Sequence, residues 1–87
     1  MRAIITGRVQ GVSYRAYTGN EARRHAIVGW VRNRDDGSVE LEAQGTPEQV
    51  AALLAWCEQG PPSASVTAVT VEELAPVDGE TELEIRY

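Results

Sequence analysis

The sequence contains no lysine and no phenylalanine, and it has only one cysteine and one histidine. A single cysteine, Cys57, excludes an internal disulfide, and with the lone His25 it leaves too few ligands for a structural zinc site. There is no apolar run near the roughly 18 residues that span a bilayer, and the N-terminus lacks a signal-peptide pattern. We therefore expect a cytoplasmic, monomeric protein with no metal, no cofactor and no membrane partner.

Charge is unevenly distributed along the chain. Residues 1–34 hold seven arginines and one glutamate, whereas residues 35–87 hold twelve acids and one arginine, so +6 and −11 give the net charge of −5. The basic part would attract a small anionic substrate. The acidic part argues against a nucleic-acid groove or an anionic membrane surface. At 87 residues the chain is expected to form one domain, residues 1–87.

Hydrophobic periodicity predicts five strands and two helices. The strands are expected at residues 2–9, 27–33, 38–43, 66–74 and 82–87, and the helices at 14–26 and 46–59. The second helix has the clearest start, because Thr46 and Gln49 form a capping-box pattern around Pro47. This order predicts an α+β, ferredoxin-like βαββαβ sandwich, a mainly antiparallel sheet with both helices on one face and a short extra C-terminal strand.

Three expectations concern burial. The carboxylates of Glu40 and Glu42 alternate with apolar residues, so they are expected on a solvated sheet face. Cys57 is expected to be a small core residue and not a nucleophile. Helical spacing predicts one inward-facing set on the first helix: Tyr14, Tyr17, Thr18, Ala22 and Ala26.

The stretch Gly-Arg-Val-Gln-Gly-Val-Ser-Tyr-Arg, residues 7–15, leaves the first strand and enters the first helix. Amides at a helix N-terminus lack intrahelical partners and favour anions, Gly11 permits an inward curl, and Arg15 adds a planar fork of donors. The pattern predicts a phosphate-binding loop, although a plain turn has the same composition. Asn33 ends the second strand and is either a turn former or a polar functional group; the sequence does not fix the register that would place it beside the loop.

Residues 7–15 resemble the first signature of the acylphosphatase family, and residues 29–45 resemble the second, with Asn33, Gly37, Val39 and Gly45 in register. The resemblance implies hydrolysis of the carboxyl-phosphate bond of small acyl phosphates without metal or cofactor. It makes Arg15 and Asn33 the catalytic residues, with Asn33 holding the attacking water. It also places backbone N–H groups of the loop on the phosphate: those of Gln10, Gly11, Val12, Ser13, Tyr14 and Arg15.

Two positions depart from the family pattern. Tyr14 stands where phenylalanine is commoner, and Arg34 stands where threonine often follows the asparagine. Three alternatives stay open: a non-catalytic module that binds phosphate or acyl phosphate, an RNA-recognition domain of the same fold, and a domain of a larger carbamoyl-transfer maturation protein. The chain ends after a full set of predicted elements, which favours a free-standing enzyme whose partner is a small-molecule acyl phosphate and not a nucleic acid.

Overall fold

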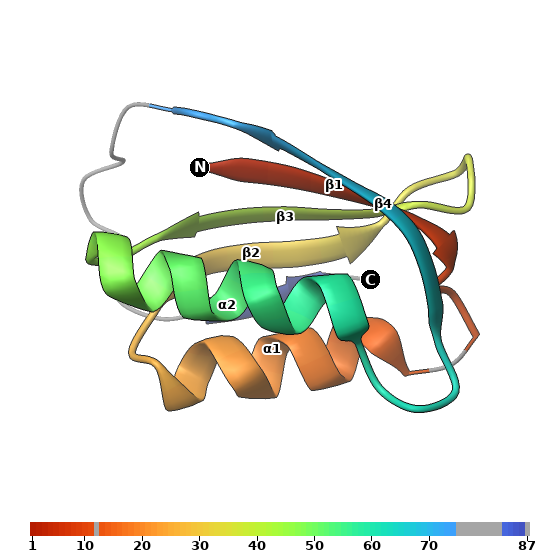
Figure 1. Cartoon of the computed structure of the whole chain (residues 1–87), viewed down its shortest axis with the longest axis horizontal. Coiled ribbons are helices and arrows are strands. Elements are labelled where there is room, and N and C mark those ends of the chain that lie inside the picture. The colour runs from red at the N-terminus through yellow and green to blue at the C-terminus, as the bar shows by residue number, and fades with distance from the viewer. Residues whose placement is uncertain (12, 75–82, 87) are drawn as a thin grey trace.

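The structure is a computed structural model that describes residues 1–11, 13–74 and 83–86. Its elements are β1 (Arg2–Arg8), α1 (Tyr14–Arg24), β2 (Val28–Asn33), β3 (Val39–Gln44), α2 (Pro47–Gln59), β4 (Ser65–Glu72) and β5 (Leu83–Arg86). Both helices lie on one face of a single sheet (Figure 1). The predicted fold class and element order are confirmed, while the connection predicted at 76–79 and the strand residues Glu82 and Tyr87 lie outside the described residues.

The strand order across the sheet is β4-β1-β3-β2-β5. The first three neighbouring pairs are antiparallel, and β2 pairs with β5 in parallel. Strands β1 and β2 therefore run in the same direction, with β3 between them. Val39 is opposite both Ile5 and Asn33, so the carboxyl ends of β1 and β2 lie at the same edge of the sheet. This register, which the sequence left open, brings the two signature segments to one place.

The core lies between the sheet and the helices. The strands contribute alternate residues that are 0% exposed, namely Ala3, Ile5, Val31, Val39 and Leu41. On α2, Leu53 and Cys57 are also 0% exposed, so the prediction of Cys57 as a core residue is confirmed. Each fully buried aliphatic side chain of this kind contributes about 1.5–3 kcal/mol through removal of apolar surface from water.

Helix α1 differs from the prediction in two respects. Tyr17 is 51% exposed, so its expected place in the core is wrong; Gly19 is buried instead, where an added Cβ would lie 2.7 Å from Ile85 Cδ1. The helix also ends at Arg24 and not at residue 26. Ala26 has φ 55°, and the next N–H, that of Ile27, donates to the Ala22 carbonyl at 3.0 Å. This six-to-one hydrogen bond is a Schellman ending, which leaves Ala26 exposed outside the helix.

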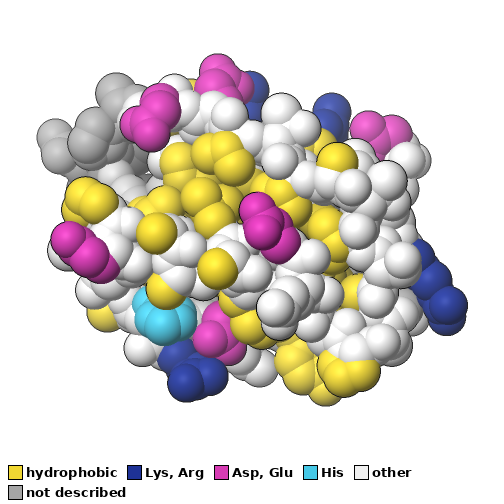
Figure 2. Space-filling model, viewed as in Figure 1, with side chains coloured by type: hydrophobic (Ala, Val, Ile, Leu, Met, Phe, Trp, Pro, Cys, Tyr) yellow, Lys and Arg dark blue, Asp and Glu magenta, His cyan; other side chains and the backbone are white. Residues whose placement is uncertain are grey.

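Helix α2 begins as predicted. The Thr46 hydroxyl accepts a hydrogen bond from the Gln49 N–H at 3.2 Å, and the Thr46 N–H donates to Gln49 Oε1 at 2.9 Å. Pro47 occupies the first helical position. The helix-bearing side still exposes hydrophobic side chains (Figure 2). Val71 of β4 is 47% exposed. Within the described ranges, no helix is long and apolar enough to cross a membrane.

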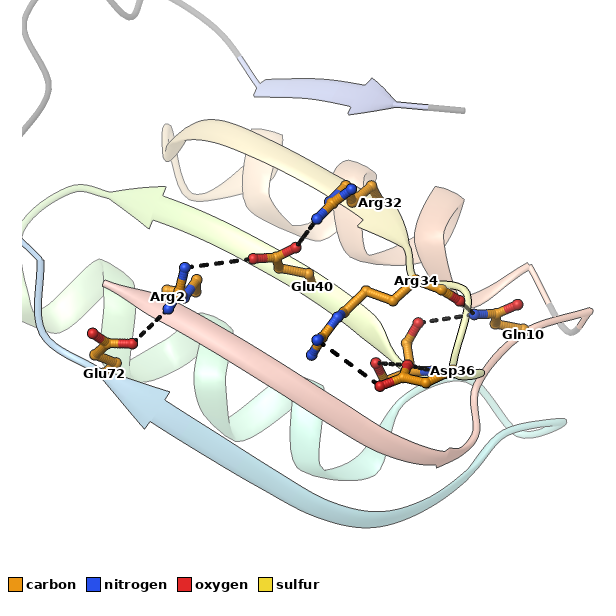
Figure 3. A network of polar contacts seen from close by, with 8 residues as sticks. Arg2, Gln10, Arg32, Arg34, Asp36, Glu40 and Glu72 are labelled. Carbon is orange, nitrogen blue, oxygen red and sulfur yellow. Dashed lines mark hydrogen bonds and ion pairs between the residues drawn. The ribbon is translucent and has the colours of Figure 1, made fainter.

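The outer face of the sheet carries a row of alternating charges across β4, β1, β3 and β2 (Figure 3). Arg2 contacts Glu72 at 2.8 Å and Glu40 at 3.8 Å, while Arg32 contacts Glu40 at 2.7 Å. Glu40 is only 7% exposed. The expectation that it is solvated is therefore wrong, because arginines on both neighbouring strands cover it. Glu42 is half-buried.

Candidate active site

The loop after β1 bends through left-handed backbone positions. Gly11 has φ 73° and Ser13 has φ 60°, while Val12, between them, lies outside the described residues. A Cβ added at Gly11 would meet nothing within 4 Å, so its backbone angle, and not lack of space, favours glycine there. Ser13 has no such freedom, and a left-handed non-glycine residue costs about 1–2 kcal/mol. Left-handed positions of this kind occur in backbone nests that bind anions.

The N-terminus of α1 leads directly from this loop. Ser13 is the N-cap residue, its side chain makes no capping hydrogen bond, and the first turn of α1 contains no acidic residue. The Tyr17 N–H donates to the Ser13 carbonyl at 3.0 Å, so the amides ahead of Tyr17 precede the first intrahelical bond. The helix dipole adds partial positive charge at the same end. This end of α1 therefore suits an anionic group.

Tyr14 anchors the loop to the core. It is 1% exposed, and its hydroxyl donates to the Cys57 carbonyl at 2.7 Å. Its ring packs on Trp56, with centroids 5.8 Å apart, and a Cβ added at Gly60 would lie 2.8 Å from the ring. Burial raises the pKa of Tyr14 above its ordinary value. Tyrosine in place of phenylalanine therefore fits this position, because the hydroxyl has a partner.

Arg15 projects from the first turn of α1 to the last strand. Its Nη1 donates to the Arg86 carbonyl of β5 at 3.0 Å. Arg86 is opposite Arg32 in the parallel β2–β5 pair, one residue before the end of β2 at Asn33. The guanidinium is therefore held at the sheet edge where β2 ends.

Asn33 is the last residue of β2, at the edge reached by the loop. Its Oδ1 is buried and has no hydrogen-bond partner within residues 1–11, 13–74 and 83–86. A buried polar atom left unpaired typically costs about 1–3 kcal/mol. Asn33 also borders a depression of about 560 Å³ whose other lining residues are Trp30, Arg32, Asp35, Glu40 and Arg86.

The hairpin between β2 and β3 is closed by its own hydrogen bonds. The Arg34 N–H donates to the Ser38 carbonyl at 2.8 Å, and Asp36 Oδ1 accepts from both the hydroxyl and the N–H of Ser38. These two hydrogen bonds lower the pKa of Asp36, and the bond from the Ser38 hydroxyl has the larger effect. The Arg34 guanidinium lies 3.9 Å from Asp36 Oδ2 (Figure 3). Arginine in place of the commoner threonine thus contacts the hairpin's own carboxylate.

Gln10 joins the loop to this hairpin. Its side-chain Nε2 donates to the Arg34 carbonyl at 2.7 Å and to the Ser38 carbonyl at 2.9 Å (Figure 3). The resemblance assigned only the backbone N–H of Gln10, so this side-chain contact was missed. No periodicity or local pattern indicates it, because the partners are 24 and 28 residues away. The structure thus brings Gln10, Arg15 and Asn33 to one edge of the sheet.

Comparison with known proteins identifies the family. The acylphosphatase family model matches residues 1–85. The chain belongs to the acylphosphatase family. It is 55% identical over 75 residues to the acylphosphatase of Azoarcus sp. (strain BH72), covering 86% of this chain and 76% of that protein. It is 45% identical over 86 residues to that of Anaeromyxobacter dehalogenans (strain 2CP-C), covering 99% of this chain and 92% of that one.

Solved structures agree with the family. The crystal structure of acylphosphatase from Bacillus subtilis superimposes with a TM-score of 0.94 at 37% identity, covering 99% of this chain and 96% of that one. A full-length HypF structure, in a phosphate- and nucleotide-bound form, gives a TM-score of 0.83 at 26% identity, but the match spans only 11% of its chain. The enzyme class of the chain is acylphosphatase, EC 3.6.1.7, whose substrates are acyl phosphates. This class favours the hydrolase over the binding-module and RNA-recognition alternatives.

Proposed function

We propose that the chain hydrolyses small acyl phosphates at the edge where β1 and β2 end. The N–H groups of residues 10–15 and the Arg15 guanidinium hold the phosphoryl group, and the Asn33 amide orients the attacking water. The single observation that carries this proposal is the buried, unpaired Oδ1 of Asn33 beside a loop that enters an uncapped helix N-terminus.

The chemistry needs little more than these groups. Phosphoryl transfer depends mainly on positioning and on stabilising charge over the phosphoryl oxygens, which a backbone nest and one arginine supply. The leaving carboxylate has a conjugate-acid pKa of about 4, by analogy with side-chain carboxyls, so it departs without a general acid. The proposed step therefore uses no metal and no cofactor.

Asn33 fits the water side of the reaction. Its amide cannot take a proton at ordinary pH, but its oxygen accepts and its NH₂ donates, so it orients water without acting as a base. An acceptor whose partner is the reacting water explains why a buried amide oxygen is tolerated without a protein partner. The water's proton then passes late in the reaction, to the phosphoryl group itself.

In-line displacement also orients the substrate. The attacking water and the leaving group lie on opposite sides of phosphorus. The acyl group therefore lies on the side of the phosphoryl group away from Asn33 and from the outer-face depression that Asn33 borders. In this proposal the depression lies on the water side of the reaction. The acyl group does not occupy it.

The test is a chelator-treated assay of acyl phosphate hydrolysis, with a phosphomonoester as the control substrate. We expect turnover of the acyl phosphate only, because a phosphomonoester has an alkoxide leaving group that requires an acid. Asn33→Ala should lower kcat by about 10²-fold while the inhibition constant of inorganic phosphate changes little, since only water positioning is lost. Asn20→Ala, at an exposed asparagine of α1, is the matched control. Hydrolysis by Asn33→Ala at the parent rate would remove Asn33 from the mechanism.

A further inference from the structure

We propose that the Gln10 side chain is a positioning residue for the reaction. Its carboxamide fastens the phosphate loop to the β2–β3 hairpin and so sets the distance between the phosphoryl group and the water held by Asn33. This inference rests on the proposed function of those two segments, and it assigns to Gln10 a role separate from its backbone N–H.

The contact consists of two hydrogen bonds from the Gln10 side chain to the carbonyls of Arg34 and Ser38, and we call it the Gln10 clamp. The one Nε2 group of Gln10 donates to the carbonyls of Arg34 and Ser38, at 2.7 and 2.9 Å, and the side chain is half-buried. The two acceptors belong to residues that are paired across the turn, because the Arg34 N–H donates to the Ser38 carbonyl. Two hydrogen bonds of ordinary length thus join the start of the loop to the hairpin.

The β2–β3 hairpin is closed by backbone hydrogen bonds that do not involve Gln10. The Arg34 carbonyl also accepts from the Gly37 N–H at 3.2 Å, and the Ser38 carbonyl accepts from the Arg34 N–H at 2.8 Å. A carbonyl oxygen has two lone pairs, so Gln10 takes the second acceptor site of each. Gln10 therefore does not build the turn, and its removal leaves the hairpin's own hydrogen bonds intact.

The position of the clamp explains why it matters for rate. Arg34 directly follows Asn33, while Gln10 is the first residue of the phosphate loop. Reaction rates depend on the alignment of the attacking and accepting atoms, and a displacement of about 1 Å costs about 10²-fold. Losing the clamp lets the loop and the hairpin move relative to each other, which lowers kcat more than it weakens phosphate binding.

The sharpest test uses Gln10→Glu, which has nearly the same shape but lacks the NH₂ group. A carboxylate would face two carbonyl oxygens, so we expect kcat near pH 7 to fall about 10-fold or more. Because its charge also repels phosphate, phosphate binding is compared in the neutral variant Gln10→Ala, where the inhibition constant of inorganic phosphate should stay within about threefold of the parent value. Protonation gives the introduced carboxyl one O–H donor, and its two acceptor neighbours favour that neutral form. The kcat deficit should therefore shrink as the pH falls from about 7 to about 5.

Two further variants separate positioning from folding. Gln10→Ala should show the same loss of kcat without the recovery at low pH, and Gln59→Ala, at an exposed glutamine ending α2, should match the parent enzyme. Combining Gln10→Ala with Asn33→Ala should cost little more kcat than Asn33→Ala alone, because the clamp acts through Asn33. Thermal unfolding of each variant shows that the folded protein is assayed.

The outcomes are distinct. If Gln10→Glu and Gln10→Ala both keep kcat within about twofold of the parent, or if kcat is unchanged while the phosphate inhibition constant rises, Gln10 does not position the site. Fully additive losses in the double variant would also overturn the clamp. Failure of the proposed function looks different: if Asn33→Ala alone hydrolyses at the parent rate, Asn33 leaves the mechanism and the clamp is overturned with it, whereas failure of the clamp alone keeps the loss in Asn33→Ala and removes the loss in the Gln10 variants.

Discussion

The N-termini of the two helices are built in opposite ways. At α2, Thr46 and Gln49 satisfy each other's backbone N–H groups, Pro47 takes the first helical position and Glu48 lies in the first turn. At α1, Ser13 has a left-handed backbone, its side chain makes no capping hydrogen bond, and no acidic residue lies in the first turn. Helix α2 therefore satisfies the donors at its own N-terminus, whereas the N-terminus of α1 keeps donors and positive potential that suit the phosphoryl group of the proposed function.

The other end of α1 shows that this departure is local. There the Schellman hydrogen bond to Ala22 completes the helix, and Arg23 and Arg24 lie in the last turn, where cations suit the dipole. Only the end that faces the ends of β1 and β2 departs from ordinary helix capping. Substitutions at Arg15, Ser13, Thr46 and Ala26 test the contrast among these helix ends.

The largest effect is expected for Arg15→Ala. It removes the guanidinium from the open end of α1, and we expect kcat/KM for an acyl phosphate to fall by about 10² to 10³-fold, equivalent to about 2.7–4 kcal/mol of transition-state stabilisation. The kcat/KM of Arg15→Lys should lie between those of the parent and Arg15→Ala, because lysine keeps the charge but lacks the planar guanidinium. Arg24→Ala, at a 74% exposed side chain in the last turn, serves as the control. Equal activities for the two alanine variants would contradict the assignment.

A carboxylate at the start of α1 should make its N-terminus resemble that of α2. Ser13→Asp places negative charge where the phosphoryl group is proposed to bind, and we expect kcat/KM to fall by about 10-fold or more through repulsion. The charge should stabilise the helix by about 0.3–1 kcal/mol through the dipole. Ser13→Asn, equal in size but neutral, separates charge from bulk in steady-state kinetics. Equal kcat/KM values for Ser13→Asp and Ser13→Asn would mean that the phosphate binds elsewhere.

Removing the N-cap hydroxyl of α2 should lower the stability of the protein and leave its activity unchanged. Thr46→Ala removes the hydroxyl that accepts from the Gln49 N–H, and we expect the free energy of unfolding to fall by about 1 kcal/mol. Activity per folded molecule should stay at the parent value. Urea denaturation measures the change, and Thr46→Ser should recover most of it. A loss of kcat from this variant would mean that the two helix starts are not independent.

The smallest effect is expected at the closed end of α1. Ala26 has φ 55° at the position after the helix, where glycine is unstrained, so Ala26→Gly should raise the free energy of unfolding by about 0.5–1 kcal/mol. Ala26→Val should lower it, because a branched Cβ is strained at positive φ. Thermal melts of both variants provide the measurement. The same sign for both would show that the left-handed angle is not the cause.

Local signals predicted the fold well. The capping box and Pro47 fixed the start of α2, and alternation located β3, because both patterns depend on neighbours within a few residues. Two of the errors were non-local: Tyr17 was assigned to the core because spacing alone does not show that Gly19 packs against Ile85, and Glu40 was assigned to solvent because its arginine partners lie on other strands.

The candidate site divides in the same way. Gly11 and Arg15 follow from a loop-to-helix pattern and a family signature, whereas the Gln10 clamp and the contact of Arg15 with Arg86 depend on sheet register. The register became known only when Val39 was found opposite both Ile5 and Asn33. The catalytic roles of Arg15 and Asn33 stay predictions until the variants are assayed.

The contact between Arg15 and Arg86 spans 71 positions of the chain. The role proposed for Arg15 therefore predicts that activity requires the first helix and the final strand to dock on the same assembled sheet. During refolding from denaturant, hydrolysis should return together with the slowest structural probe, and no partly folded species should turn over substrate. On this prediction, the enzyme's own turnover would report the completion of its tertiary structure.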